Sequence, residues 1–457
     1  MVQSKQFPTL SERLTVAAVL KYAKLASGSS VEQQEVLGLH SVIRKQFKDE
    51  RDIIYLSNPI PSRVAEFYGD FVAGDSEDIL IDGSALDAEG QALLARIVYE
   101  SDLKELFSRL AESQSVAGKA VSYVYTDAAG TPVIGEVPAD QYFPQPDGTV
   151  VLATYVSAYA QSVRKLKCLT QHFRIDGGRL VIERQAWNCN DDGVVAEEVP
   201  LESVAALLGL SVDAVSSYDG ITEIPIRASL NGRDGSPDIK ACVPQLAEIN
   251  ERMSHVSVEL LKNLDAKMVL PSSLADESGN VRAFDTIFIP QGQTDVNARY
   301  VTNSNPLIAD AREHVTEQVK LVSLATGVPM WEITKGAMPD NAKALRIQMF
   351  PAIRKASRKR ASLRRSIQDL IRIAFMFKGK KLEQDIPIKF GDVLPVDELE
   401  QAQVEDTRIR AGISSRRNAI QRTYGMDEAQ AQDEFDAIRE EETLVGAGTM
   451  DAPQLGV

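Results

Sequence analysis

The chain has 457 residues, and its 44% hydrophobic and 25% charged residues are typical of a soluble globular protein of about two or three packed units. Its 28 glycines and 20 prolines are too few for a chain that is disordered throughout. The excess of 65 acidic over 50 basic residues gives a net charge of −15, which excludes a protein that grips nucleic acid through its overall field.

The first part of the chain is predicted to be helical. Ser11 and Ser29-Ser30 are candidate N-caps of two helices, the second of which extends to Phe47. The stretch NPIPSRVAEFYGDFVAG predicts an extended entry through Pro61-Ser62, followed by a short helix that stops at Gly74. The apolar face of this short helix consists of Val64, Phe67, Tyr68, Phe71 and Val72.

One long helix is predicted from Ala92 to Ser115, and the hydrophobic period changes from 3.6 to 2 at Lys119. Asp127 to Gly130 and Asp176-Gly177-Gly178 are turn signals between strand candidates. The strand candidates are Val121–Tyr125, Val133–Val137, Val150–Ala158, Lys167–Ile175 and Arg179–Trp187. This antiparallel region after helices predicts an α+β unit.

Two long helices are predicted next, with a small β-rich insert between them. The first has Ser236 as N-cap and Pro237 at N1, runs to Ala266 over about 30 residues, and is kinked by Pro244. The insert, Met268 to Asn303, holds three short apolar pieces. The second helix opens at Asn305-Pro306 and is closed by Gly327 and Pro329. Both helices carry apolar residues at every third or fourth position: Ile239, Val243, Leu246, Ile249, Met253, Val256, Leu260 and Leu264, then Ile308, Ala311, Val315, Val319 and Val322.

A third long helix is predicted from Ala342 to Phe377, with a kink at Pro351. Its basic residues greatly outnumber its acidic ones, and the balance reverses beyond Asp392. Two interpretations stay open for these basic residues: a solvated or intersubunit face that pairs with the acidic segment beyond 392, or an approach to DNA or to the capsid's scaffolding. The residues from Thr443 onward are predicted to be disordered.

The motifs of catalysis and metal binding are missing. The three cysteines Cys168, Cys189 and Cys242 and the four dispersed histidines form neither a disulfide framework nor a metal-ligand cluster. The sequence has no GxGxxG, GxxxxGK[ST], GxSxG or HExxH motif. We therefore expect no catalytic residue, no metal and no cofactor. Without a signal peptide or a long apolar run, we expect folding in the cytoplasm and no membrane association.

The order of these parts resembles that of the phage portal proteins, in the SPP1-like, siphovirus-type branch. The stretches that carry the resemblance are NPIPSRVAEFYGDFVAG, GKAVSYVYTDAAGTPVIGEVPADQYFPQPD, DIKACVPQLAEINERMSHVSVELLKNLDAKMVLP, PDNAKALRIQMFPAIRKASRKR and AGISSRRNAIQRTYGM. They span roughly residues 50–442 piecewise, and their specificity lies in their order and spacing.

The resemblance implies a non-enzymatic ring, usually a dodecamer, at one capsid vertex of the virion, through which double-stranded DNA is packaged and ejected. Its expected partners are the terminase large subunit, the head-tail adaptor, and the major capsid and scaffolding proteins. The implied fold is α+β, with an α/β wing, a two-helix stem, a small β-containing clip, a long kinked helix and a short helical crown. The implied parts are the wing (1–235), first stem helix (236–267), clip (268–304), second stem helix (305–328), tunnel loop (329–343), kinked helix and wing return (344–409), crown (410–442) and disordered tail (443–457).

The implied functional residues fall into two sets, besides the helix kink at Pro351. The tunnel loop nearest DNA would contain Lys335, Gly336, Met338, Asn341 and Lys343, although an ordinary helix–helix connection has the same composition. Packing between subunits in the stem would use Ile249, Met253, Val256, Leu260, Val315, Val319 and Val322.

Physical reasoning agrees with a ring, because a ring buries an interface on every subunit and so explains long apolar helical stripes. A negative net charge suits a channel through which phosphates slide. Two alternatives are a cytoplasmic oligomeric scaffold or adaptor without a DNA function, and, with less support, an enzyme whose site residues are too dispersed to recognise.

Overall fold

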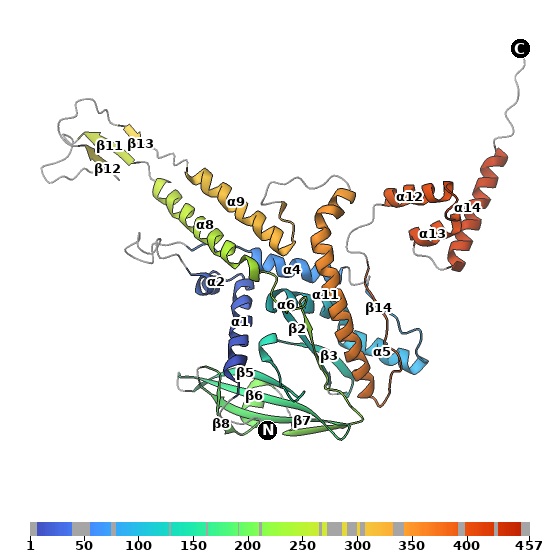
Figure 1. The fold of residues 1–457 in the computed structure, drawn as a ribbon, viewed down its shortest axis with the longest axis horizontal. Helices are drawn as coiled ribbons and strands as arrows, with labels where there is room; N and C mark the ends of the chain where they lie inside the picture. Colours follow the sequence, from blue (N-terminus) through green and yellow to red (C-terminus); the bar gives the residue numbers. More distant parts are fainter. Residues whose placement is uncertain are drawn as a thin grey trace, which may run out of the picture. The chain divides into compact units, whose positions relative to one another are not determined.

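The computed structural model describes residues 7–38, 55–74, 79–127, 129–160, 163–190, 192–209, 213–264, 267–271, 286–289, 299–301, 307–331, 342–391, 398–424 and 428–448. The chain divides into two compact units, one formed by residues 1–338 with 348–391 and the other by 339–347 with 392–457. Helices and antiparallel sheets coexist (Figure 1), so the predicted α+β class is confirmed.

The N-terminal helices differ from the prediction at their ends. Thr9 rather than Ser11 caps the first helix, through a capping box with Glu12. Ser29 caps the second helix as predicted, but this helix ends at Leu37, and the predicted continuation to Phe47 lies outside the described residues. Pro61 lies in the first turn of α4 and not in an extended entry. The helices are α1 (Leu10–Ala26), α2 (Ser30–Leu37) and α4 (Ile60–Ala73).

The single helix predicted over 92–115 is two helices, α5 (Ala88–Glu100) and α6 (Leu103–Ala117). The break falls at Ser101 and Asp102, where Asp102 has a left-handed φ of 43°. The buried Ser101 hydroxyl accepts a hydrogen bond from the Ile134 N–H at 2.9 Å, so a contact with a strand far along the chain stabilises the break. The spacing of apolar residues in the sequence does not indicate that contact, so it does not predict the break.

Two antiparallel sheets follow, and every predicted strand and hairpin of this region is confirmed. The smaller sheet has the order β10-β2-β3, and the larger has the order β4-β5-β6-β7-β8 with β9 paired to β7. Asp176 and Arg179 are cross-strand partners around the predicted Gly177-Gly178 turn. The strands are β2 (Lys119–Thr126), β3 (Pro132–Val137), β4 (Tyr142–Pro144), β5 (Val150–Ala160), β6 (Val163–Asp176), β7 (Arg179–Cys189), β8 (Val195–Val199), β9 (Val215–Asp219) and β10 (Ile226–Leu230).

The next helix, α8, begins later than predicted. A short 3₁₀ turn over Lys240–Cys242 precedes α8 (Val243–Leu264), which therefore has 22 residues rather than about 30. Pro244 lies in its first turn, where a missing N–H costs nothing, so the predicted kink is wrong. The second helix, α9 (Leu307–Thr326), ends before Gly327 as predicted.

The β-rich insert between α8 and α9 is confirmed. Its strands are β11 (Lys267–Pro271), β12 (Thr286–Ile289) and β13 (Arg299–Val301). β11 is parallel to β12 and antiparallel to β13, with Lys267 opposite Val301. This pairing brings the outer ends of α8 and α9 together, so the two helices form a hairpin that lies side by side in Figure 1.

The third long helix is confirmed as α11 (Ala342–Met376) and continues through Pro351. The strands β1 (Leu80–Ile81) and β14 (Ile388–Lys389) then pair with each other. The second unit contains α12 (Glu398–Arg410), α13 (Arg416–Tyr424) and α14 (Glu428–Gly448). Because α14 extends to Gly448, the prediction of disorder from Thr443 is wrong for its first residues, and 449–457 lie outside the described residues.

The main core lies between α5, α6, the sheets and the second half of α11, where Leu363, Ile367, Leu370 and Ile371 are fully buried. A second core joins α4 to the inner ends of α8 and α9. In the described part of the chain, no helix combines the length and apolar character needed to cross a membrane.

Gly118 ends α6 where the chain comes very close to a distant loop. Its φ is 77°, and an added Cβ would lie 2.0 Å from the carbonyl oxygen of Gly235. We expect Gly118→Ala to lower the free energy of unfolding by about 2–4 kcal/mol, through left-handed strain and overpacking. Urea unfolding followed by circular dichroism measures this loss.

Gly130→Ala is the matched control. Gly130 has a similar φ of 73°, but an added Cβ would meet nothing within 4 Å. We expect it to lose only about 1–2 kcal/mol, and equal losses in both variants would contradict the steric argument.

Candidate functional site

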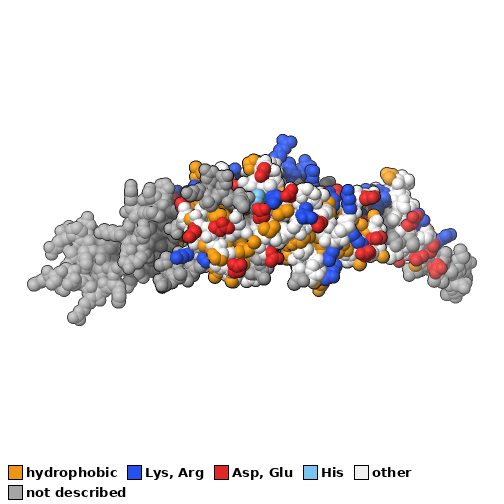
Figure 2. Space-filling model, turned by 90° about the horizontal axis from the view of Figure 1, so that it is seen from below, with side chains coloured by type: hydrophobic (Ala, Val, Ile, Leu, Met, Phe, Trp, Pro, Cys, Tyr) orange, Lys and Arg blue, Asp and Glu red, His pale blue; other side chains and the backbone are white. Residues whose placement is uncertain are grey.

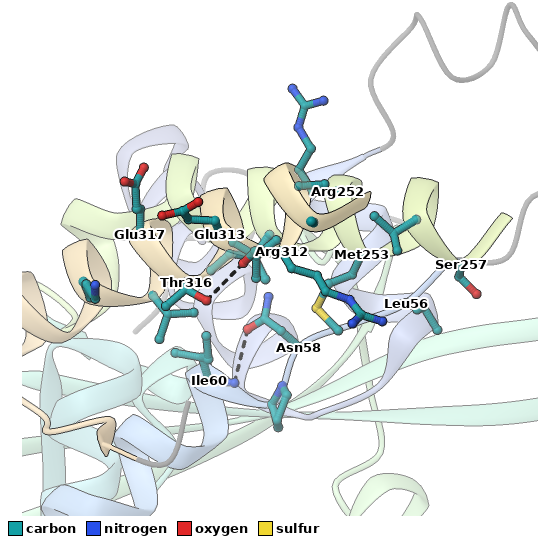
Figure 3. Close-up of a pocket in the computed structure, with 18 of the residues that line it drawn as sticks. Leu56, Asn58, Ile60, Arg252, Met253, Ser257, Arg312, Glu313, Thr316 and Glu317 are labelled. Carbon is teal, nitrogen blue, oxygen red and sulfur yellow. Dashed lines mark hydrogen bonds between the residues drawn. The ribbon is translucent and has the colours of Figure 1, made fainter. Parts of the chain in front are cut away.

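A groove of about 1170 Å³ runs between α8 and α9. Its walls are apolar: Ile249, Met253, Val256 and Leu260 from α8, with Val315 and Val319 from α9. In Figure 3, Met253 and Thr316 point toward the floor of the groove, and Arg252, Glu313 and Glu317 point away from it. An apolar groove with a charged rim has the chemistry of a protein-binding surface.

The residues predicted to pack between subunits separate into two groups. Ile249, Val319 and Val322 are at most 2% exposed and belong to the chain's own second core. Ile249 and Val319 also line the groove, so the role between subunits stays a prediction for these two and for Val322. The remaining four are accessible: Met253, Val256 and Val315 are partly buried, and Leu260 is 40% exposed.

The floor of the groove is held by a network of buried amides that the sequence does not reveal. The Asn58 N–H donates to Asn250 Oδ1 at 3.0 Å, and the Asn58 carbonyl accepts from Gln33 Nε2 at 2.9 Å. Asn250 Nδ2 donates to Gln33 Oε1 at 3.1 Å and to the Tyr55 hydroxyl at 2.8 Å. These hydrogen bonds fix residues 55–58 against α8 and α2.

A buried ion cluster lies at the inner end of the hairpin, centred on Asp238. Asp238 Oδ1 lies 2.8 Å from Lys355 Nζ, and Asp238 Oδ2 lies 3.1 Å from Lys359 Nζ. The same carboxylate accepts from Ser115 Oγ at 2.7 Å and from Asn231 Nδ2 at 2.8 Å. The side chains of Asp238 and Lys359 are each 1% exposed, so this is a fully buried ion pair that connects the loop before α8 to α11.

Tyr68 of α4 connects this cluster to the end of α9. Its hydroxyl donates to the Thr326 carbonyl at 2.7 Å, and Lys355 Nζ donates to the same oxygen at 3.1 Å. Lys355 and Lys359 both lie over the Tyr68 ring, 5.2 Å from its centroid. The Asp238 cluster, formed by Asp238, Lys355, Lys359, Tyr68, Ser115 and Asn231, thus anchors both helices of the hairpin to α11.

Burial and charge shift the pKa values in this cluster in opposite directions. Burial lowers the pKa of Lys359 to about 8, although the Asp238 charge acts against the shift. Burial alone would raise the pKa of Asp238, but the charges of Lys359 and Lys355 hold it below its ordinary value. Asp238 and Lys359 are therefore both charged at neutral pH, and the cluster has the character of an ion pair that stabilises the fold.

The structure assigns partners to part of the basic set on α11. Lys355 and Lys359 pair with Asp238, and Arg372 pairs with Glu223, Asp369 and Asp385. These acidic residues all precede residue 392, so pairing with the acidic segment beyond 392 is wrong for these three. Figure 2 shows acidic and basic side chains interspersed with apolar ones over the face seen there.

Of the five predicted tunnel-loop residues, the structure describes one. Lys335, Gly336, Met338 and Asn341 lie outside the described residues, and Lys343 lies in the first turn of α11. Within the described ranges, no group of three or more His, Cys, Asp and Glu side chains is arranged to hold a metal ion.

Comparisons with known proteins give one family. The family model described as phage portal protein, SPP1 Gp6-like, matches residues 57–443. No curated protein matches the sequence. A similar solved structure is a chain from the neck of an empty GTA particle computed with C6 symmetry, at 14% identity and a TM-score of 0.43, with 81% of this chain and 90% of that chain covered.

Proposed function

This chain belongs to the SPP1 Gp6-like family of phage portal proteins, and we propose on this premise that its copies close into a dodecameric ring around double-stranded DNA. A portal protein is a ring-forming component of the phage particle at the capsid vertex, and the family is structural rather than enzymatic. We propose that the ring assembles in the host cytoplasm and serves DNA packaging and later ejection.

We propose that α8 and α9 are the stem of the portal, because they form a helical hairpin with a β-rich insert at its outer end. Residues 268–304 are then the clip, which binds the terminase large subunit and later the head-tail adaptor. The α+β part, 1–235, is the wing, residues 329–343 are the tunnel loop, and 410–442 are the crown. The wing and crown face the major capsid and scaffolding proteins.

Besides membership of the family, the observation that best supports ring assembly is the open apolar groove of the stem. Its outer wall includes Leu260, whose side chain is 40% exposed in a single copy. A chain that stays alone in water does not gain from an apolar groove of this size, whereas a neighbouring subunit would bury it. We propose that Met253, Val256, Leu260 and Val315 pack between subunits.

We expect purified wild-type protein to form closed rings with a central hole in negative-stain electron microscopy, and Leu260→Asp to prevent ring formation at micromolar concentration. The reason is that a carboxylate in an apolar interface loses its hydration without gaining a partner. Mass photometry gives the fraction of chains in rings.

Leu207→Asp is the matched control, because Leu207 is also an exposed leucine, at 48%, but lies in a short turn between β8 and β9. If both variants formed rings equally well, the groove would not be part of the interface between subunits. A wild-type chain that stays monomeric would favour the scaffold alternative over the portal ring.

A further inference from the structure

The basic residues of α11 divide between two opposite faces of the helix. The buried face includes Ala352, Ala356 and Leu363, and the residue two positions after each of these is an exposed arginine. Two positions correspond to roughly 200° around an α-helix. Arg354, Arg358 and Arg365 therefore form one line on the solvent side, here called the arginine ridge.

Acidic side chains of the described ranges do not pair directly with the arginine ridge, although Arg358 borders a pocket that Asp234 and Asp238 also line. Within the ranges that the structure describes, none of its three guanidinium groups lies in an ion pair, and the Arg354 guanidinium lies 5.5 Å from the centre of the Phe350 ring. Like charges at a spacing of four residues destabilise a helix. A ridge of this kind is compensated when an anionic surface covers it.

A complementary surface lies on α4 and α6, with Glu136 of β3 at its edge. The carboxylates of Glu66, Asp70, Glu105 and Glu136 lie around Glu112, and burial together with these four charges raises the pKa of Glu112. Glu136 accepts a hydrogen bond from Ser113, which leaves its charge in place. We call these five residues the α4–α6 acidic face. Arg63 and Arg109 are exposed on the same two helices, and no ion pair joins either to this face in the described part.

The two surfaces point in opposite directions. Glu66 and Asp70 each follow a buried residue of α4, Val64 and Tyr68, by two positions, and so lie on the far side of α4. Tyr68 contacts α11 through Lys355 and Lys359, and the Val72 carbonyl of the same helix accepts a hydrogen bond from Arg360 Nε at 2.9 Å. The contact between α4 and α11 therefore separates the acidic face from the arginine ridge, and the chain's own acidic face cannot cover its own ridge.

We propose that the arginine ridge of one copy docks on the α4–α6 acidic face of the next copy in the ring. A ring needs two different, complementary patches on opposite sides of each subunit, and these two surfaces meet that requirement in sign and in position. The proposal rests on the proposed ring. A second copy suits the ridge better than DNA does, because the complement is present on every chain and the chain as a whole carries a charge of −15.

The test uses full-length protein and charge reversal. We expect Arg354→Glu with Arg358→Glu, and separately Glu66→Lys with Asp70→Lys, each to raise the concentration at which rings form by at least about tenfold. The chain that carries all four substitutions regains rings, because the two reversed surfaces again attract each other. Arg96→Glu, on the exposed side of α5, is the control and leaves assembly unchanged. Mass photometry over a dilution series gives these concentrations.

The outcomes separate the possible errors. The docking is wrong if the wild type and both charge-reversal variants form rings at the same concentration, or if the variant with all four substitutions does not recover ring formation. Neither result contradicts the portal ring itself. A wild-type chain that forms no rings overturns the proposed ring and the docking with it. A third result is that the Arg354→Glu, Arg358→Glu variant still forms rings but no longer retains a fluorescent DNA duplex. In that case the arginine ridge contacts DNA, and the proposal is wrong.

Discussion

Asp238→Asn is expected to lower the free energy of unfolding by about 3–5 kcal/mol, the loss typical of a buried charge that keeps its burial but loses its partner. Lys359 is 1% exposed and its ammonium lies 3.1 Å from Asp238 Oδ2. The amide keeps the shape and, with its oxygen in the place of Oδ1, the hydrogen bond from Asn231, while its nitrogen faces the Ser115 hydroxyl, which can accept as well as donate. The main change is therefore the loss of the charge. Chemical denaturation at neutral pH, followed by circular dichroism, measures the loss.

Two further variants separate the ion pair from its surroundings. Asp234→Asn lies in the same loop, where the carboxylate is exposed and accepts from Ser236 at 2.7 Å, and we expect a loss below about 1 kcal/mol. Asp238→Asn combined with Lys359→Met removes both buried charges and recovers most of the stability. If the double variant were as unstable as Asp238→Asn alone, the loss would come from packing and not from the unpaired lysine.

The pH dependence of the same pair has a defined sign. The folded-state pKa of Lys359 is about 8, below the ordinary 10.5 that applies to the unfolded chain. Between these two values the unfolded state binds more protons, so stability rises with pH across this window. The wild type should therefore gain stability relative to Lys359→Met between pH 8 and pH 10.5, and a difference that stays constant would contradict the lowered pKa.

Local patterns predict a large part of this fold. The three short strands between α8 and α9 are predictable because each apolar piece is bounded by polar turns, and the β6–β7 hairpin because Gly177-Gly178 accepts the left-handed conformation of its turn. The predicted helix ends are wrong where contacts with residues far along the chain determine them. The hydroxyl of Ser101 bonds to β3 and stabilises the break in the helix predicted over 92–115, and Asp238 pairs with α11 before α8 begins.

The candidate site shows the same limit. An apolar stripe at helical spacing predicts burial at Ile249, Val319 and Leu260 alike, but it does not say which neighbour buries each residue. The structure places the first two in the chain's own core and leaves the third exposed, because α4 covers only the inner end of the hairpin. The Asp238 cluster brings together residues from four separate segments, namely α4, α6, the loop before α8 and α11, so no local motif indicates it.

Replacing residues 268–300 by a short Gly-Ser linker is expected to leave ring assembly intact and to abolish binding of the terminase large subunit. Lys267 and Val301 are opposite each other in the ladder of β11 and β13, and opposed Cα atoms in such a ladder lie about 4.5–5.5 Å apart. A linker of about four residues therefore joins α8 to α9 without moving either helix. Co-sedimentation of rings with purified terminase, followed by a DNA-packaging assay, measures both effects.

The same linker inserted between Gly177 and Gly178 is the matched control, because it lengthens an exposed hairpin turn and leaves the β-rich insert in place. We expect the control to bind terminase as the wild type does. Packaging at the wild-type rate by rings that lack 268–300 would show that the insert is not the clip. Loss of the rings themselves would assign the insert to ring closure, because the groove between α8 and α9 is lined by residues outside the deleted segment and should survive the deletion.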